Sequence, residues 1–235
     1  MELRIGCNQP LLPLIEERNG EPAGFEPELA RLVCERLGWW PRWLYRPFPD
    51  LPDLLDAGEL DCIMWNFAAT PERAARFALS RAYGGTDMAL LVREESSLAG
   101  VDDLAGRTVG AVRGTTNLEE AQRLPQRPEV RVYDPGMRVL GQLVDDVLGG
   151  VIDAALDDEV PFRAIVARTP GLRIAGSLPT RSRYVVAFPA ADGARRDALD
   201  DALTGLVASG DLARLWQRHV GAPIPNDVIS DPAAG

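Results

Sequence analysis

The most restrictive feature of this sequence is the alternation of short apolar stretches with amphipathic ones along its first 67 residues. Three apolar stretches are typical of buried strands: "LRIGCN", "WPRWLYRP" and "GELDCIMWNF". Between the first two, apolar residues recur at helical spacing from Glu26 to Leu37, and Gly38 marks the end of that helix. Between the second and the third, Asp50 can cap a short helix that reaches Ala57. This alternation predicts an α/β fold, in which helices cover both faces of a mainly parallel sheet.

The alternation continues through the rest of the chain with different lengths. Asn19 and Gly20 predict a tight turn between two short extended pieces near the start. Further strands are predicted at "MALLV", "RTVGAV", "EVRVYD", "VIDAALDD" and "SRYVVAFP". Helices are predicted at "SLAGVDDLAG", "TTNLEEAQRL" and "MRVLGQLVDDVLGG", and a last helical region is broken at Gly210. Only "PIPNDVISDPAAG" is expected to be loosely ordered. Together, these elements predict two units of alternating strands and helices in series.

Composition and charge narrow the classes of function. The 235 residues are 46% apolar, which is enough for the core of one large or two small soluble domains. The net charge is −10, so the phosphates of nucleic acids and anionic membrane surfaces would be repelled. All 25 basic residues are arginine, which excludes Schiff-base lysine chemistry and a lysine-dependent phosphate-binding loop. We therefore expect no nucleic-acid partner.

The cysteines and the N-terminus bear on the cellular compartment. Cys7, Cys34 and Cys62 form neither a CxxC pair nor an even set, and we expect reduced, buried thiols. No signal-like segment precedes "LRIGC", and no apolar run approaches the ~18 residues needed to span a bilayer. The protein is expected to be periplasmic or surface-anchored if a leader has been removed, and cytoplasmic if the chain is natively leaderless. Both alternatives stay open.

The stretch "TPERAARFALSRAY" contains one residue that local structure does not explain. Thr70 can cap a helix, Pro71 suits its first position, and Glu72 interacts favourably with the helix dipole. A positive charge at a helix start is mildly unfavourable, so the helix start does not explain why an arginine occupies position 73. Arg73 is therefore predicted to contact a ligand; the alternative is a solvated residue of the first turn.

Several stretches, taken in order, resemble the type II periplasmic solute-binding proteins, specifically the amino-acid-binding group (family 3 of the bacterial extracellular solute-binding proteins). The resemblance covers nearly the whole chain. It rests on "GEPAGFEPELARLVCERLG", "LPDLLDAGELDCI", "TPERAARFALSRAY", "SLAGVDDLAGRTVGAVRGTT", "LGGVIDAALDD" and "YVVAFP" with the C-terminal helices.

The resemblance implies a two-lobed α/β fold, in which each lobe is a mixed, mainly parallel sheet with helices on both faces. Lobe 1 would comprise residues 1–87 and 186–235, and lobe 2 residues 88–185. Two crossing strands, near Asp87–Ala89 and near Arg183–Val185, would form the hinge, and the ligand would lie in the cleft between the lobes.

The resemblance also implies how a zwitterionic ligand is anchored. Arg73 matches the family's carboxylate-binding arginine, and a guanidinium suits this role because its planar fork donates two parallel hydrogen bonds. In the loop "RGTTN", Gly114 and Thr116 lie where free backbone N–H groups and hydroxyls can reach an anion, and Thr116 would share the carboxylate. The alternative for Thr116 is a plain N-cap of a helix that starts near Asn117.

The acids that end the stretch "VIDAALDD" would bind the ligand ammonium, because open α/β sheets place ligands at the carboxyl ends of their strands. Asp158 matches the family's ammonium-binding aspartate, and the alternative is a solvated loop acid. Asp157 lies where relatives vary, so it either tunes specificity or faces water.

The side-chain pocket is implied by a second group of positions. Asn8 lies where relatives that bind cationic or amide side chains often carry an acid, so a strongly cationic ligand side chain is not expected. Phe48 matches the usual aromatic wall, and Leu11 lies where relatives often carry an aromatic lid.

Trp65, Asn66 and Ala68 precede the TPER stretch and complete the predicted site. Relatives often carry a glycine or serine at Asn66 and a threonine or serine at Ala68. Ala68 therefore lacks a hydroxyl that normally helps to bind the carboxylate. Either Asn66 compensates, or the ligand differs at that end.

The leading functional hypothesis is a monomeric binding protein without catalytic residues, cofactor or metal. It would capture a small amino acid or a related polar zwitterion or carboxylate, for delivery to an ABC permease. The alternative is an enzyme that resembles cyclohexadienyl or arogenate dehydratases, in which Glu159 or Asp158 would protonate the departing hydroxyl of a prephenate-like acid. The lone histidine, His219, lies on the last helix and is not expected to act as acid or base.

Overall fold

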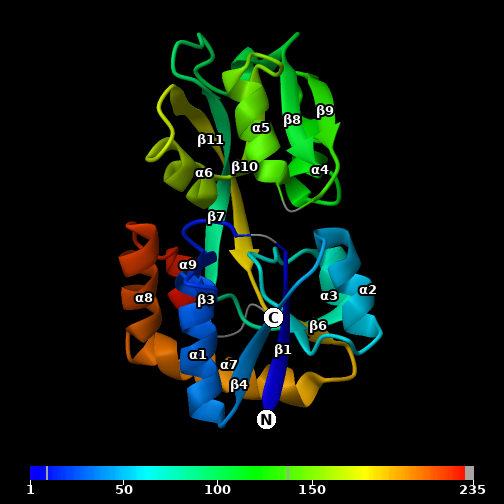
Figure 1. Cartoon of the computed structure of the whole chain (residues 1–235), viewed down its shortest axis with the longest axis vertical. Helices are drawn as coiled ribbons and strands as arrows, with labels where there is room; N and C mark the ends of the chain where they lie inside the picture. Colours follow the sequence, from blue (N-terminus) through cyan, green and yellow to red (C-terminus); the bar gives the residue numbers. More distant parts are fainter. Residues whose placement is uncertain (9, 137, 231–235) are drawn as a thin grey trace. The chain divides into compact units, whose positions relative to one another are not determined.

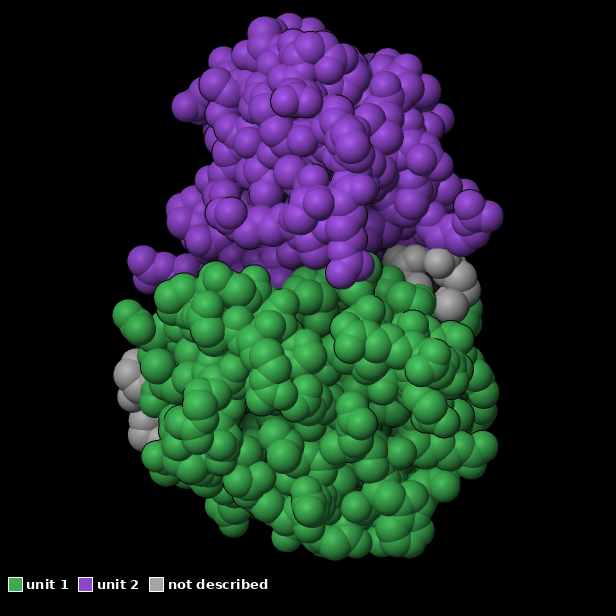
Figure 2. All heavy atoms as spheres, turned by 60° about the vertical axis from the view of Figure 1, so that its left-hand side comes forward, with its two compact units in different colours: residues 1–85, 182–235 green, residues 86–181 purple. Residues whose placement is uncertain are grey.

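The computed structural model describes residues 1–8, 10–136 and 138–230, and these form two α/β units. Unit 1 comprises Met1–Gly85 and Ser182–Gly235, and unit 2 comprises Thr86–Arg181 (Figure 2). Unit 1 is therefore built from two segments that lie far apart in the sequence. The predicted α/β fold class is confirmed. The hinged movement of two lobes, with the boundaries expected from the resemblance, stays a prediction.

Unit 1 contains a mixed five-stranded sheet with the strand order β4-β1-β5-β12-β6. β1, β4 and β5 are parallel, whereas β12 runs antiparallel to β5 and β6. The register pairs Gly6 of β1 with Ile63 of β5, so the carboxyl ends of these two strands meet at one edge of the sheet. The strands are β1 (Glu2–Cys7), β4 (Trp40–Tyr45), β5 (Cys62–Ile63), β6 (Phe77–Leu79) and β12 (Ala187–Pro189).

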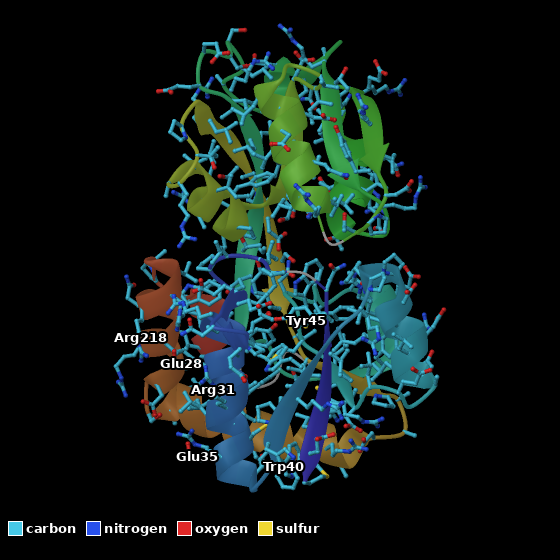
Figure 3. All side chains as sticks on the ribbon, viewed as in Figure 1. Glu28, Arg31, Glu35, Trp40, Tyr45 and Arg218 are labelled. Atoms are coloured by element: carbon cyan, nitrogen blue, oxygen red, sulfur yellow. The ribbon has the colours of Figure 1, made fainter. Side chains whose placement is uncertain are left out.

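Helices flank this sheet. α1 and α8 lie side by side, where Glu28 of α1 accepts hydrogen bonds from Arg218 at 2.6 Å and from the ring of His219 at 2.7 Å (Figure 3). On another flank, Arg76 of α3 pairs with Asp53 and Asp56 of α2. The elements are α1 (Phe25–Leu37), the 3-10 helix η1 (Phe48–Asp50), α2 (Leu51–Asp56), α3 (Pro71–Arg76), α7 (Gly193–Ala208), α8 (Asp211–Val220), α9 (Asn226–Ser230) and the hairpin of β2 (Glu16–Arg18) and β3 (Glu21–Ala23).

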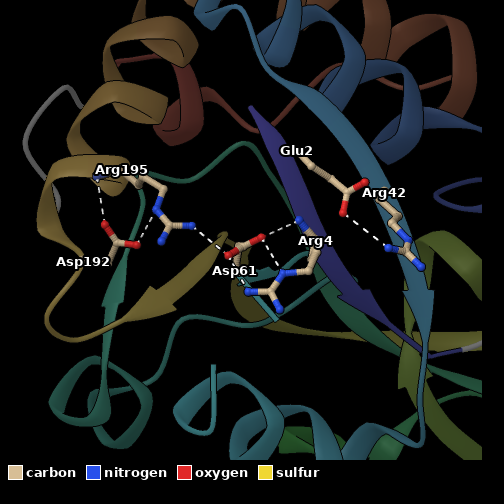
Figure 4. Close-up of polar contacts among 6 residues, drawn as sticks. All are labelled: Glu2, Arg4, Arg42, Asp61, Asp192 and Arg195. Atoms are coloured by element: carbon tan, nitrogen blue, oxygen red, sulfur yellow. Dashed lines mark hydrogen bonds and ion pairs between the residues drawn. The ribbon is translucent and has the colours of Figure 1, made fainter. Parts of the chain in front are cut away.

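A buried carboxylate joins the two chain segments of unit 1 (Figure 4). Asp61 is 8% exposed and accepts hydrogen bonds from Arg4 Nη2 and Arg195 Nη1, both at 2.9 Å. Burial alone would raise the pKa of Asp61, but the hydrogen bonds from the two arginines outweigh it and lower this pKa to about 2. Since Arg4 lies in β1 and Arg195 in α7, this group fixes the C-terminal segment to the first strand.

Unit 2 contains a second sheet, with the order β11-β7-β10-β8-β9 (Figure 1). β8 is parallel to β9 and β10, and β10 is antiparallel to β7. Leu90 and Leu91 of β7 face two different hydrophobic cores, as expected for a strand covered on both faces. The elements are β7 (Gly84–Arg93), the 3-10 helix η2 (Val101–Leu104), β8 (Thr108–Val112), α4 (Thr116–Arg123), β9 (Glu129–Tyr133), α5 (Val139–Leu148), β10 (Ala154–Asp158), α6 (Glu159–Val166) and β11 (Leu172–Tyr184).

Several predicted elements are corrected by the structure. Asp50 does not cap α2, because the preceding 3-10 turn already places its backbone in helical geometry. The strand predicted at "GELDCIMWNF" is reduced to Cys62–Ile63. The single strand predicted at "SRYVVAFP" is divided, since β11 ends at Tyr184 in one sheet and β12 begins at Ala187 in the other.

The C-terminal stretch predicted to be loosely ordered contains α9, and residues 231–235 of it lie outside the described residues. β6 and α6 were not predicted. Cys7, Cys34 and Cys62 are buried and unpaired, as expected. None of the helices in the described ranges is long and apolar enough to cross a membrane.

Candidate functional site

Contacts with the backbone and with aromatic rings of unit 1 hold Arg73 in place. Its backbone N–H donates to Thr70 Oγ1 at 3.2 Å, which confirms Thr70 as the N-cap of α3. Its Nη1 donates to the carbonyl oxygen of Ala68 at 2.8 Å. Its guanidinium carbon lies 4.1 Å from the ring centroid of Phe67 and 5.7 Å from that of Phe48. The side chain is partly buried against aromatic rings, so Arg73 is only partly solvated.

Aromatic side chains form the surface that supports Arg73. The ring centroids of Phe48 and Trp65 are 5.3 Å apart, and those of Phe48 and Phe67 are 6.3 Å apart. Phe48 and Phe67 belong to an apolar cluster that also includes residues of α2 and β5, and Trp65 packs against it. The structure therefore brings the predicted residues Phe48, Trp65 and Arg73 together. Phe67 was missed, because the left-handed bend at Asn66 breaks the alternation of side chains that an extended segment would show.

Asn66 and Ala68 shape the backbone between β5 and α3. Asn66 has a φ of 38°, in the left-handed region that asparagine tolerates better than most residues. Its N–H donates to Glu26 Oε1 at 2.6 Å. Ala68 pairs with Tyr184 through an isolated bridge and presents its carbonyl oxygen to Arg73. The backbone of Ala68 thus contributes to the site where a hydroxyl had been expected from relatives.

Asn8 and Leu11 follow the end of β1. The N–H of Met64 donates to the carbonyl of Gly6 at 3.1 Å, which keeps this strand end beside the segment that carries Trp65. Asn8 is 1% exposed, and its Oδ1 has no hydrogen-bond partner among the described residues. Leu11 is buried in a short turn, where its N–H donates to the carbonyl of Ile15 at 2.7 Å. A buried amide oxygen without a partner is costly, so Asn8 is suited to bind a polar group.

In unit 2, two adjacent threonines have different roles at the start of α4. Thr115 is the N-cap: its Oγ1 accepts from the N–H of Leu118 at 3.2 Å and donates to the carbonyl of Val112 at 2.7 Å. Thr116 is the first helical residue, and its hydroxyl makes no hydrogen bond within the described ranges. The capping role considered for Thr116 therefore belongs to Thr115. Gly114 has a φ of 79°, which favours glycine at this turn.

Asp157 and Asn117 connect the ends of β10 and α4. Asn117 Nδ2 donates to Asp157 Oδ1 at 2.7 Å, and the N–H of Asp158 donates to the same oxygen at 2.7 Å. Desolvation and the neighbouring charge of Asp158 raise the pKa of Asp157 above its ordinary value, although the N–H of Asp158 opposes this rise. Asn117 is 5% exposed, with no partner for its Oδ1 in the described part of the chain. Asn117 was not predicted as a site residue, although it belongs to the motif "RGTTN".

Asp158 is buried at the junction of β10 and α6. It is 4% exposed, so the alternative of a solvated loop acid is wrong. It occupies the N-cap position of α6 without a side-chain capping bond, and the N–H of Val160 instead donates to Thr86 Oγ1 at 3.3 Å. Because the helix start does not use the Asp158 side chain as a cap, capping does not explain why an acid is buried here.

The groups considered for catalysis have other partners. Glu159 Oε1 accepts a hydrogen bond from Arg163 Nε at 2.6 Å, one turn further along α6. His219 contacts Glu28 between α8 and α1. No cluster of three or more metal-ligating side chains is found in residues 1–8, 10–136 and 138–230.

The chain is similar to known proteins over most of its length. The family described as bacterial extracellular solute-binding proteins, family 3, matches residues 3–222. The chain is 27% identical over 231 residues to the "Probable amino-acid-binding protein YxeM" of Bacillus subtilis, covering 94% of this chain and 85% of that protein. It is 30% identical over 165 residues to the histidine-binding periplasmic protein of Escherichia coli K12, covering 67% of this chain and 61% of that protein.

A solved structure shares the fold. The amino acid ABC transporter substrate-binding protein AbpA of Streptococcus pneumoniae, bound to L-arginine, superposes with a TM-score of 0.84 at 24% identity, covering 96% of this chain and 97% of that one. The matched family and relatives are binding proteins, so the dehydratase hypothesis is not favoured. With the family match extending from residue 3 to residue 222, the chain belongs to the bacterial extracellular solute-binding proteins, family 3.

Proposed function

We propose that this protein captures a small amino acid or a related polar zwitterion and releases it unchanged. The observation that carries the proposal is the presence of two opposite charges on supported side chains. Unit 1 presents the guanidinium of Arg73 from an aromatic surface, and unit 2 presents the buried carboxylate of Asp158. A zwitterion carries both complementary charges, and each must be paired when it loses water.

Arg73 binds the ligand carboxylate in this proposal. Its contacts with the Ala68 carbonyl and the Phe67 ring fix the direction of the guanidinium. A guanidinium has five N–H donors in a planar fork, which suits a bidentate bond to a carboxylate. Because Ala68 has no hydroxyl, Asn66 and Thr116 supply the remaining hydrogen bonds to the carboxylate.

Asp158 binds the ligand ammonium, and Asp157 supports it. Asp157 accepts the N–H of Asp158 and the amide of Asn117, and these bonds orient the strand end that carries both acids. An ammonium group beside two carboxylates gains a paired charge in a partly desolvated place.

The ligand side chain is neutral and polar or aromatic. Asn8, Phe48, Trp65 and Leu11 line its pocket, and none of these residues offers a negative charge to a cationic side chain. The protein acts as a monomer and delivers its ligand to an ABC permease. Support for this partner comes from the solved structure at 24% identity, which is named as an ABC transporter substrate-binding protein.

The test is isothermal titration calorimetry with each of the twenty standard amino acids, together with the variant Asp158→Asn. We expect saturable binding of at least one neutral amino acid by the wild type, and a loss of about 30-fold or more in the variant, because its ammonium partner is no longer charged. Absence of binding by every amino acid would refute the proposal. Formation of phenylpyruvate on incubation with prephenate would refute the statement that the ligand is released unchanged.

A further inference from the structure

Glu26 is a buried acid that the proposed binding chemistry does not use. It lies in the first turn of α1 and is 0% exposed. Its Oε1 accepts two hydrogen bonds, from the N–H of Asn66 at 2.6 Å and from the hydroxyl of Tyr83 at 2.5 Å. Its Oε2 has no hydrogen-bond partner in the described ranges. Burying a carboxyl group with one unpartnered oxygen is costly, so its presence calls for a physical reason.

The bond to Asn66 fixes the point where the backbone turns from β5 towards α3. Asn66 has a φ of 38°, and a left-handed residue persists only where its surroundings stabilise it. The residues that follow this bend are Phe67, whose ring supports the guanidinium, and Ala68, whose carbonyl accepts from Arg73. Any shift of the bend therefore moves both supports of Arg73.

The bond to Tyr83 connects the same oxygen with the start of β7. Tyr83 is fully buried, and its backbone N–H donates to the carbonyl of Tyr184 at 2.9 Å. Its ring packs against those of Phe25 and Tyr184, with centroid distances of 6.1 and 6.3 Å. One carboxyl oxygen thus joins the first turn of α1, the bend at Asn66 and the residue that precedes β7.

We propose that Glu26 is a positioning residue for the ligand segment, defined as Trp65–Arg73: its Oε1 holds the left-handed bend at Asn66 and so sets where the Arg73 guanidinium is presented. The proposal rests on the proposed function, because it assigns Glu26 a role in ligand affinity. Glu26 touches no ligand itself and acts through the backbone of Asn66.

The titration of Glu26 offers a direct readout. Burial raises the pKa of Glu26 to about 7, against the opposing effect of the hydrogen bonds from Tyr83 and Asn66. The titratable groups that face it are Tyr83 and, from β1, Cys7, and burial raises the pKa of both. Of Glu26, Tyr83 and Cys7, Glu26 is therefore the residue expected to change charge between pH 6 and pH 8.5. The NMR signal of the Asn66 backbone N–H, which donates to Glu26, should respond to this change.

The experiment compares Glu26→Gln, Glu26→Leu and the control Tyr83→Phe, each titrated with the twenty standard amino acids at pH 8.5. Leucine removes the acceptor, so Glu26→Leu should weaken binding by about 10-fold. Glutamine keeps a carbonyl oxygen that can accept both bonds, so Glu26→Gln should bind within about threefold of the wild type. Tyr83→Phe leaves the bond to Asn66 and should do the same.

In parallel, the ¹H–¹⁵N signal of Asn66 is followed against pH without ligand. It should shift with a midpoint near 7 in the wild type and stay constant in Glu26→Gln. Full affinity in Glu26→Leu, or an Asn66 signal without a midpoint in the wild type, overturns the proposal, and the second result decides even if Glu26→Leu does not fold. If no amino acid binds the wild type, the proposed function fails, while the Asn66 signal still decides whether Glu26 holds this backbone.

Discussion

Glu26 in unit 1 and Asp157 in unit 2 each lie beside candidate ligand residues. The two carboxyl groups accept similar hydrogen bonds but have different charged neighbours. Glu26 in unit 1 accepts a backbone N–H, from Asn66, and a side-chain donor, from Tyr83. Asp157 in unit 2 likewise accepts the N–H of Asp158 and a side-chain donor, from Asn117. The pKa of each is raised above its ordinary value, mainly by burial.

The difference lies in the nearest charge. The charge of Asp158 contributes to the raised pKa of Asp157, whereas burial is what raises the pKa of Glu26. A cation bound at Asp158 would therefore change the protonation of Asp157 but not that of Glu26. Asp61 shows the opposite limit, since its pKa is lowered to about 2 where two arginines donate to a buried carboxylate. If the proposed ligand residues bind as we propose, proton and ligand binding should be coupled in unit 2, whereas unit 1 should bind through the permanent charge of Arg73.

The largest effect is expected from removing that permanent charge. Arg73→Ala should weaken amino-acid binding by about 100-fold or more, because it removes a charged bidentate donor, while leaving the unfolding temperature nearly unchanged. The measurement is calorimetric titration beside thermal unfolding. Arg76→Ala on the same helix is the matched control, since Arg76 is exposed and pairs with Asp53 and Asp56. Equal losses in both variants would mean that α3, rather than the Arg73 guanidinium, carries the effect.

Substitution of Asp61, the carboxylate with two arginine partners, should lower the stability of the fold and leave ligand binding unchanged. Asp61→Asn should lower the free energy of unfolding by about 2 kcal/mol at pH 7, because Arg4 and Arg195 lose their common partner. The folded pKa of about 2 lies below the ordinary value of 3.8, so this contribution is present above pH 4 and is lost as the pH falls towards 2. Urea unfolding at several pH values measures it.

The control for Asp61 is Glu2→Gln, which removes an exposed ion pair with Arg42 (Figure 4). This change should alter the free energy of unfolding by less than about 0.5 kcal/mol. A wild-type protein whose stability does not fall between pH 4 and pH 2 more steeply than that of Asp61→Asn would contradict the assignment.

Substitutions of Thr115 and Thr116 should have different effects, the first on stability and the second on binding. Thr115→Val removes the N-cap of α4 and should lower the free energy of unfolding by about 1 kcal/mol. Thr116→Val should leave stability unchanged and weaken binding by about fivefold, the effect of one lost hydrogen bond. Chemical unfolding and calorimetric titration of both variants provide the test. If Thr116→Val binds as well as the wild type, Thr116 is not a ligand residue.

The smallest effect tests the comparison most directly. Binding of an ammonium beside Asp158 should lower the pKa of Asp157, so the wild type should release a fraction of a proton at pH 7 and bind about threefold more tightly at pH 8 than at pH 6. Calorimetry in buffers of different ionisation enthalpy measures the proton release. Asp157→Asn should abolish it, and Glu26→Gln should leave it unchanged. Proton release that depends on Glu26 instead would reverse the contrast between the units.

Much of the fold could be predicted because strand and helix periodicity are local properties. Arg73 was predicted as a ligand residue because the rules for helix starts account for Thr70, Pro71 and Glu72 but give no reason for an arginine beside them. Strand lengths were less accessible: β5 has only two residues, because pairing with its neighbours rather than apolar sequence decides where a strand ends.

Glu26 could not be singled out from the sequence, because its contacts are made by residues far along the chain. An acid in the first turn of a helix is expected from the helix dipole alone, so its sequence position raises no question. The role we propose for it depends on its hydrogen bond with Asn66, which lies 40 residues further along the chain. Asn117 was missed similarly, since its contact with Asp157 spans 40 residues.

The two-segment construction of unit 1 has a consequence for the newly synthesised chain. Translation delivers the N-terminal end first, so the whole of unit 2 leaves the ribosome before the residues from Ser182 onward that complete unit 1. Until then Asp61 lacks Arg195, which lies 134 residues away, and β5 lacks its neighbour β12. The unit whose synthesis begins first is therefore the last to acquire all of its strands, and its open sheet edge has to stay soluble while the other unit is being made.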